Sequence, residues 1–202
     1  MNQRTYVWLK ARTKKTKKQG KTMRKTIIAL FALSLFGWTS AGAGWDEDEV
    51  AELEPKVAIT VEKILEKDEG MKSFFDKAVG YAVFPNVGKG GFGIGGARGT
   101  GLLKTGDGTT VAVVTLTQLS IGFQAGGQAY SEFIFFEDDI ALGNFQRGNY
   151  ELGAQVSAVA ITAGASADAK FNEGIAIFTE AKGGLMYEAS VGGQKFKIEE
   201  AE

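Results

Sequence analysis

Apolar residues recur at spacings of three and four between residues 46 and 78, which is typical of a helix with one buried side. The series comprises Val57, Val61, Ile64, Leu65, Met71, Phe74, Phe75 and Ala78. Pro55 suits the first turn of this helix, and Gly70 is expected to end it before a second short helix. Because Glu62, Glu66, Asp68 and Glu69 make the other side acidic, the pattern favours a helix that covers a sheet. An amphipathic helix that lies on a membrane is the alternative.

After Val79 the pattern changes to short β-type runs separated by glycine. The runs are GYAVF, GFGIGGA, GLLK, TTVAVVTL, SIGFQAGGQAYSEFIFF, ELGAQVSAVAITAG, GIAIFTE and GLMYEASVGG. Turns are expected at 105–108 and 181–184, each between apolar runs. So many strands in one short chain predict an α+β fold, with N-terminal helices packed on a strongly curled, glycine-rich antiparallel sheet or partly closed barrel.

Two further segments stand out in the strand region. The segment DDIALGNFQRGN is expected to form a short helix, with Asp138 or Asp139 capping its start and Gly148 its end. Residues 133–136, with the sequence FIFF, form the most apolar run after residue 43. We expect this run in the core, although one face of such a strand would also suit acyl chains.

The stretch FPNVGKGGFGIGGARGTG, residues 84–101, contains eight glycines. Gly91, Gly93 and Gly96 match the spacing of a dinucleotide-binding loop, whose chemistry requires a helix directly afterwards. A strand pattern follows instead, so the sequence argues against nucleotide binding. The glycines are better explained by bulges, bends and close approach of backbones in a coiled sheet.

The first 43 residues have the composition of a targeting segment, with ten basic residues and no acidic one. From Met23 a short basic start leads to an apolar run at 27–38 and then to the small residues of 41–43, which predicts a signal peptide cleaved near Ala43. Met23 is the expected true start. The apolar run is shorter than a bilayer span requires. We therefore expect a leader at 1–43, an acidic segment at 44–55 and a single domain at 56–202, located in the periplasm or outside the cell.

Composition excludes several function classes for the mature chain. Residues 44–202 hold 13 basic and 24 acidic residues, a net charge of −11, which argues against nucleic-acid binding. The sequence has no cysteine and no histidine, so it has no thiol to lipidate and no conventional zinc site. We expect no metal, no cofactor and no transmembrane helix in the mature chain.

Carboxylates remain as the only conventional acid and base groups. Glu137, Asp138 and Asp139 lack the spacing of a calcium loop, and helix capping explains them better. Glu132 and Asp168 would have to converge in a cleft to act as a hydrolase pair. The preferred interpretation of Glu132 is a buried or edge-strand polar contact near Tyr130 or Gln128, and the chain is not expected to be an enzyme.

Three stretches together resemble the SYLF family, also called the Ysc84 family of lipid-binding domains. They read FFDKAVGYAVFPNVGKGGFGIGGARGTGLL, SIGFQAGGQAYSEFIFFED and IAIFTEAKGGLMYEASVGGQKF, and the similarity runs from about Glu54 to Lys197. The resemblance implies one α+β domain that binds phospholipid without catalysis, as an envelope protein in bacteria. It also associates membrane contact with the N-terminal segment and with basic residues.

Cations within the matched stretch are the candidate headgroup ligands. They are Lys89, Arg98 and Lys104 near the glycine strands, and Lys182, Lys195 and Lys197 near the last hairpin. Arg98 is the preferred single residue because a guanidinium binds phosphate with two parallel hydrogen bonds. Exposed Phe92 or Phe84 beside them would strengthen the case. The alternative function is a structural or protein-interaction domain of the envelope that has no lipid ligand.

Overall fold

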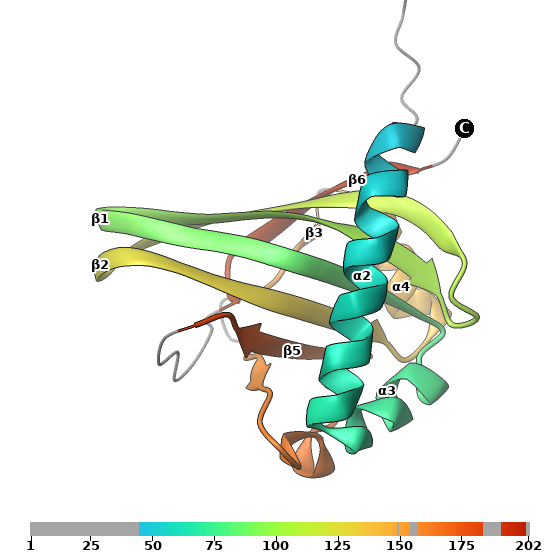
Figure 1. The fold of residues 1–202 in the computed structure, drawn as a ribbon. Helices are drawn as coiled ribbons and strands as arrows, with labels where there is room; N and C mark the ends of the chain where they lie inside the picture. The colour runs from blue at the N-terminus through green and yellow to red at the C-terminus, as the bar shows by residue number, and fades with distance from the viewer. Residues whose placement is uncertain (1–44, 149, 154–156, 184–190, 201–202) are drawn as a thin grey trace, which may run out of the picture. The chain divides into compact units, whose positions relative to one another are not determined.

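The computed structural model describes residues 45–148, 150–153, 157–183 and 191–200, without the side chains of 92–94 and 120–126. Its helical elements are α2 (Glu47–Lys67), η1 (Glu69–Met71), α3 (Lys72–Lys77), α4 (Asp139–Gln146) and η2 (Ala165–Asp168). Asp46 caps α2 by accepting a hydrogen bond from the Asp48 amide at 2.9 Å. Helix α2 buries Leu53, Val57, Thr60 and Ile64. The helix therefore covers the sheet, as its apolar spacing predicts (Figure 1).

Pro55 lies inside α2, so its expected place in the first turn is wrong. The missing amide of Pro55 leaves the carbonyl of Ala51 without its helical partner. Both residues are exposed, so water can bind that carbonyl. The helix therefore begins within the acidic segment, at Glu47, and continues through the proline.

Six strands form one sheet in the described part of the chain. They are β1 (Gly80–Thr105), β2 (Thr110–Phe136), β3 (Tyr150–Glu151), β4 (Val159–Ala160), β5 (Ile175–Ala181) and β6 (Gln194–Glu200). Strand β6 pairs with the first part of β2, at 112–118, whereas β5 pairs with its last part, at 130–136. All named pairings are antiparallel except β4 with β5. The predicted α+β class and the curled, mainly antiparallel sheet are confirmed.

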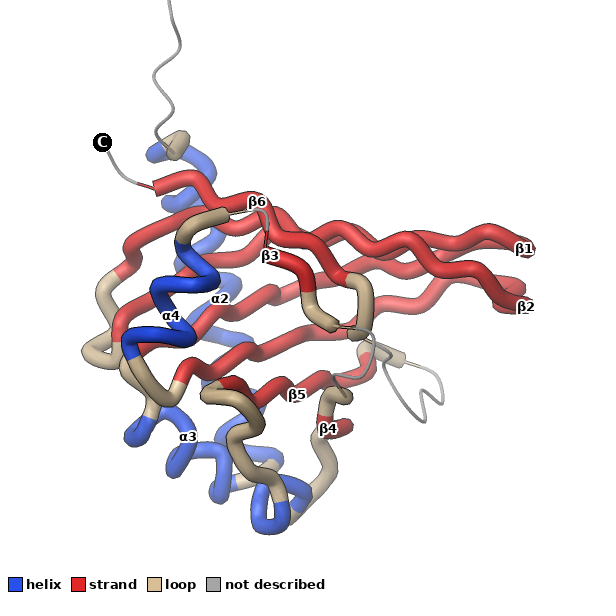
Figure 2. Tube along the Cα trace, turned by 180° about the vertical axis from the view of Figure 1, so that it is seen from behind, coloured by secondary structure: helices blue, strands red, loops and turns tan. Residues whose placement is uncertain are grey.

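The two long strands run out to one end of the sheet and return, as Figures 1 and 2 show from opposite sides. Strand β1 therefore approaches itself, with Gly99 beside Asn86 and Gly101 beside Val83. A Cβ atom at Gly101 would lie 2.2 Å from the Val83 carbonyl oxygen, which is far inside van der Waals contact. Glycine is required at this position because the backbones are so close. The register shifts at 84/87, 91/93 and 103/104 confirm the predicted bulges.

The sheet has a hydrophobic core on each face. A helix-side core lies under α2 and α3 and includes Phe74, Phe133, Phe135 and Phe178. An inner core lies within the curl on the α4 side and includes Phe84, Ile134, Phe136, Phe145 and Phe196 (Figure 2). The apolar run at 133–136 thus alternates between both cores, and the prediction that it is buried is confirmed.

The local predictions for turns and caps have mixed outcomes. Asp138 caps α4 by accepting from the Ala141 amide at 2.8 Å, and the turn at 105–108 joins β1 to β2. The single strand expected from ELGAQVSAVAITAG is wrong for most of the residues described there, since β3 and β4 are the only named strands at 151–153 and 157–164. Residues 184–190 lie outside the described residues. Strand β6 comes after the last predicted run and was not anticipated.

A strained turn gives a test of this local geometry. Asn172 and Ile175 exchange backbone hydrogen bonds of 2.8 and 3.0 Å around Glu173 and Gly174, whose φ values are 51° and 77°. Both central residues are therefore left-handed, as in a type I′ turn, where asparagine is preferred to glutamate. We expect Glu173→Asn to raise the free energy of unfolding by about 1 kcal/mol in urea denaturation. Glu173→Gln removes the charge but keeps the strain, so an equal gain there would contradict this explanation.

Candidate functional site

Four polar residues form a row across four neighbouring strand segments. Arg98 of β1 pairs with Thr117 of β2, which pairs in turn with Lys195 of β6. Lys195 pairs with Glu151 of β3. Directly paired residues lie on the same face of a sheet, so Arg98 and Lys195 flank Thr117. Two strand spacings separate the two cations by ~10 Å at the backbone, which lets both side chains reach one anion.

The row lies in an open groove of about 620 Å³. Arg98, Thr117, Lys195 and Glu151 line it together with Gly88, Gly96, Ala97, Gln118, Leu119 and Gly193. Leu119 is 86% exposed, so an apolar side chain stands beside the two cations. Ligand sites in proteins commonly have volumes of about 300–1,000 Å³. The groove falls in that range, whereas a cavity near Tyr150 and Lys170 measures about 110 Å³.

The two cations differ in their partners. The Lys195 ammonium lies 3.3 Å from the Glu151 carboxylate, and both side chains are more than half exposed. Arg98 is exposed and has no hydrogen bond or ion pair with any described residue. The row therefore carries a net positive charge. Its most available donor is the guanidinium of Arg98, which we chose from the sequence as the preferred phosphate ligand.

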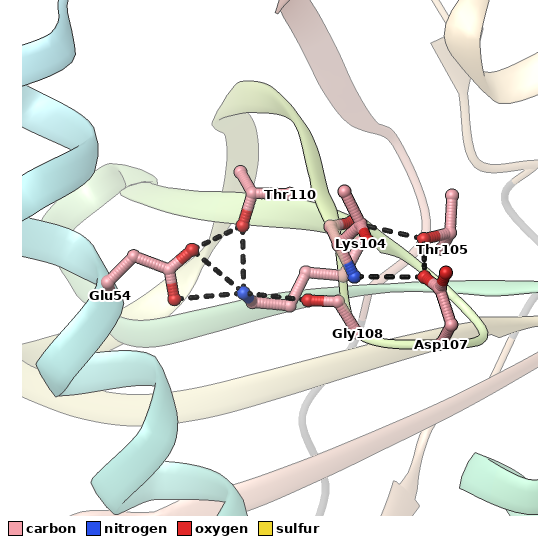
Figure 3. A network of polar contacts seen from close by, with 7 residues as sticks. Glu54, Lys104, Thr105, Asp107, Gly108 and Thr110 are labelled. Atoms are coloured by element: carbon pink, nitrogen blue, oxygen red, sulfur yellow. Dashed lines mark hydrogen bonds and ion pairs between the residues drawn. The ribbon is translucent and has the colours of Figure 1, made fainter.

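Lys104 lies in a different environment, between α2 and the turn after β1. Its ammonium donates to both carboxylate oxygens of Glu54 at 2.8 Å and to Thr110 Oγ1 at 2.8 Å (Figure 3). It also contacts the Gly108 carbonyl at 3.3 Å. Burial alone would raise the pKa of Glu54, but the hydrogen bonds from Lys104 and Thr110 outweigh burial and lower it. Lys104 thus links α2 to the sheet through Glu54, and its ammonium is already engaged and not available to a headgroup.

The other predicted candidates lie apart from the groove lining. Lys89 is 9% exposed, follows Val87 on the inner face, and has no partner among the described residues. Lys182 follows β5, where burial and nearby Lys63 lower its pKa despite the opposing effect of Glu180. Lys197 pairs with Glu199 at 2.6 Å. Phe92 belongs to β1, but its side chain is outside the described set.

Phe84 does not stand beside the cations, contrary to the expectation that it could be exposed there. It is fully buried and its ring centroid lies 5.9 Å from that of Phe196. The alternation of β1 directs Phe84 into the inner core. The exposed apolar residue of the groove is Leu119 instead.

A buried polar cluster occupies the inner core beside the groove strands. Gln194 of β6 donates from Nε2 to Glu132 Oε2 at 2.9 Å and to the Tyr130 hydroxyl at 3.3 Å. Burial raises the pKa of Glu132 to about 8, although the hydrogen bond from Gln194 opposes the increase. Glu132 is therefore uncharged at neutral pH, and its other oxygen, Oε1, has no partner among the described residues. The predicted buried polar contact is confirmed, with Gln194 as an unanticipated partner.

Glu132 and Asp168, the two carboxylates considered as a hydrolase pair, lie in different environments. Glu132 lies in the sealed inner core, whereas Asp168 is exposed in η2. Within the described ranges, no group of three His, Cys, Asp or Glu residues could hold a metal ion. Among the helices described, none is long and apolar enough to cross a membrane.

Fold and groove together define a class of protein, an α+β domain with a cation-lined groove on its sheet. Residues 117–202 match the family model Ysc84, described as Las17-binding protein actin regulator. This part of the chain belongs to the Ysc84, or SYLF, family, and the predicted resemblance is confirmed. The matched segment begins at Thr117, within β2, and so contains the rest of β2, all of β5 and β6, and the Lys195 side of the groove.

A curated relative extends the similarity toward the N-terminus. The chain is 31% identical over 146 residues to Beta cell expansion factor A of Aeromonas veronii. The similarity covers 68% of this chain and 52% of the relative. The chain thus spans about half the length of this relative.

Sequence reasoning identified Arg98 and Lys195 but missed Thr117, Leu119 and Glu151. The alternation in β2 would have put Thr117 and Leu119 on one face, because they are two residues apart. No pattern marks Glu151, since its strand is two residues long. Its place beside Lys195 follows only from the pairing of β3 with β6.

The contributions of Lys104 and Lys195 to stability can be compared directly. We expect Lys104→Met to lower the free energy of unfolding by about 1–3 kcal/mol, because it leaves Glu54 and Thr110 without their shared donor. Lys195→Met should change it by less than about 1 kcal/mol, because an exposed ion pair contributes little. Urea denaturation measures both. Equal losses in the two variants would contradict the assignment of Lys104 as the structural lysine.

Glu132 predicts a pH dependence of stability. Its pKa is about 8 in the folded chain against a reference value of 4.5, so the unfolded chain loses this proton first as the pH rises. Stability should therefore fall from about pH 4.5 to about pH 8, by at most about 1.4 kcal/mol per pH unit, and then level off. In Glu132→Gln this fall in stability with pH should be absent, because the variant has no carboxyl group at position 132. Urea midpoints of both chains at pH 5 and pH 8.5 test it, and a constant difference between the chains would refute it.

Proposed function

We propose that this domain is a non-enzymatic phospholipid-binding module that attaches to a membrane surface through the groove of Arg98 and Lys195. The observation that carries the proposal is the placement of both cations and exposed Leu119 in one groove. The three residues come from β1, β6 and β2, so the fold itself assembles them. Family membership supports a binding role.

The chemistry of the groove suits a phosphorylated headgroup. The Arg98 guanidinium offers two parallel donors to a phosphate, and Lys195 adds a point charge from the other side of Thr117. A basic residue near an anionic surface contributes about 1 kcal/mol of attraction. Leu119 adds apolar area that is removed from water when it enters the interface. Electrostatic and apolar contributions are therefore both expected.

The proposal extends to location. Residues 1–43 lie outside the described residues, and their sequence supports a cleaved leader that delivers the domain to the periplasm or beyond. A bacterial envelope lipid is then the proposed ligand. The choice of lipid and leaflet is left to the binding experiment.

A protein partner is the second candidate function. The family description names Las17 binding and actin regulation, which are properties stated for members of that family. On this chain, Ile140 of α4 is 76% exposed, on a helix away from the groove. That residue gives a protein partner a separate contact surface.

Vesicle binding tests the leading proposal. The purified chain is sedimented with phosphatidylcholine vesicles that contain 0 or 30% phosphatidic acid, at low and high salt. We expect Arg98→Ala and Lys195→Ala each to weaken binding to the anionic vesicles about fivefold, the effect of removing about 1 kcal/mol of attraction. Leu119→Ser should weaken the part of the binding that resists salt.

Lys197→Ala is the matched control, because it removes an exposed lysine of β6 that is not among the groove-lining residues. It should change binding by less than twofold. Equal effects of Lys197→Ala and Lys195→Ala would show that total charge and not the groove determines binding. Capture of an envelope protein that depends on Ile140, without vesicle binding, would favour the second candidate.

A further inference from the structure

Glu151 is the one acidic side chain in the lining of the groove, among the residues that the structure describes. It lies at the end of the row, directly paired with Lys195, and its carboxylate is 3.3 Å from the Lys195 ammonium. A phosphate that binds between Arg98 and Lys195 must therefore share the ammonium with this carboxylate or displace it. Glu151 is therefore placed to affect how a ligand binds at Lys195.

The backbone holds Glu151 in this place. The Leu152 amide donates to the Gln194 carbonyl at 2.9 Å, and the Gly193 amide donates to the Leu152 carbonyl at 2.9 Å. These two bonds hold Leu152, the residue directly after β3, against the start of β6. Leu152 is buried in the inner core, which anchors the segment further. The backbone of Glu151 is thus held at the groove, so its carboxylate stays within reach of Lys195 even when the exposed ion pair opens.

The charges of the row show how Glu151 affects the binding of an anion. Arg98 and Lys195 would give the row two positive charges, and Glu151 reduces the total to one. An anion then gains less on binding, because it meets a smaller positive field and competes for Lys195. The ion pair itself is weak because both side chains are exposed, so a ligand of sufficient charge can displace it.

We infer that Glu151 is a built-in competitor that weakens anion binding at Lys195, and so sets how strongly anionic a surface must be before the domain attaches. This inference rests on the proposed function, since it assigns a regulatory residue to the same groove. The ligand class is a phosphate oxyanion, either free or as a lipid headgroup. Removal of the carboxylate should strengthen binding, whereas removal of either cation should weaken it.

The test titrates the full chain with soluble dibutyrylphosphatidic acid and, separately, with inorganic phosphate. The NMR shifts of the Thr117 amide and the Arg98 Nε–H group report binding at the groove, independently of the basic N-terminal residues. We expect Glu151→Gln to bind dibutyrylphosphatidic acid about fivefold more tightly than the unmodified chain, which corresponds to one surface charge. Tightening for both probes would identify phosphate as the recognised group. Tightening for the lipid alone would show that the lipid's glyceryl and acyl part is needed as well.

Glu199→Gln is the matched control, because it removes an acid of β6 that has its own lysine partner and does not line the groove. It should change the affinity by less than twofold. In the background of Lys195→Ala the gain from Glu151→Gln should become smaller, since the competed ammonium is gone. A gain of equal size with and without Lys195, or from Glu199→Gln, would overturn the inference.

The failure of this inference can be told apart from failure of the proposed function. If the unmodified chain binds and Glu151→Gln binds equally well, Glu151 is not a competitor but the groove remains a site. If no chain shows shifts at Arg98 and Thr117, with Glu151→Gln included, both proposals fail. Binding that is detected only in Glu151→Gln would support the inference directly.

Discussion

The close approach of β1 to itself is the constraint on which the rest of this structure depends. Gly99 and Gly101 leave no room for a Cβ atom against the backbone at Val83 and Asn86, so the two-stranded ribbon of β1 and β2 can fold back on itself. Because β2 folds back too, its two ends become available to different partners, β6 and β5. The curl, the inner core and the groove all follow from that single reversal.

The curl also explains the buried polar cluster. The curl brings the last part of β2 opposite β6, which is paired with the first part of β2, so that Gln194 contacts Glu132 and Tyr130. An uncharged carboxyl group with a hydrogen bond is tolerated in a core, whereas a carboxylate would be costly. Ionisation of Glu132 is thereby coupled to the integrity of the same strands that carry Lys195 and Thr117. Conditions that loosen the inner core would affect the groove as well.

Lysines with similar sequence surroundings have divergent roles in this fold. Lys104 and Lys195 both lie in strands, next to apolar residues, yet one is enclosed by Glu54 and Thr110 and the other stands in an open groove. The difference arises because α2 crosses one part of the sheet (Figure 1), where its Glu54 reaches Lys104, whereas no residue of α2 lines the groove. Charge alone therefore does not identify a ligand contact. Whether a lysine can reach a ligand depends on whether a neighbouring helix covers it.

The sequence by itself determined the elements that rest on local physics. Apolar spacing identified α2, alternation identified β5 and the buried run at 133–136, and side-chain capping placed α4 at Asp138. The resemblance of the quoted stretches identified the family. Arg98 was chosen for its chemistry, and the structure leaves its guanidinium available in the groove.

Only the tertiary structure decided which segments meet. A straight ribbon and a folded ribbon have the same alternation, so the sequence divided β1 and β2 into five runs and could not pair β6 with β2. Lys104 lies 50 positions from its partner Glu54 in the chain, and Lys195 lies 44 positions from its partner Glu151. Such contacts depend on how the sheet curls, because pairing between distant strands leaves no periodic signal in either strand.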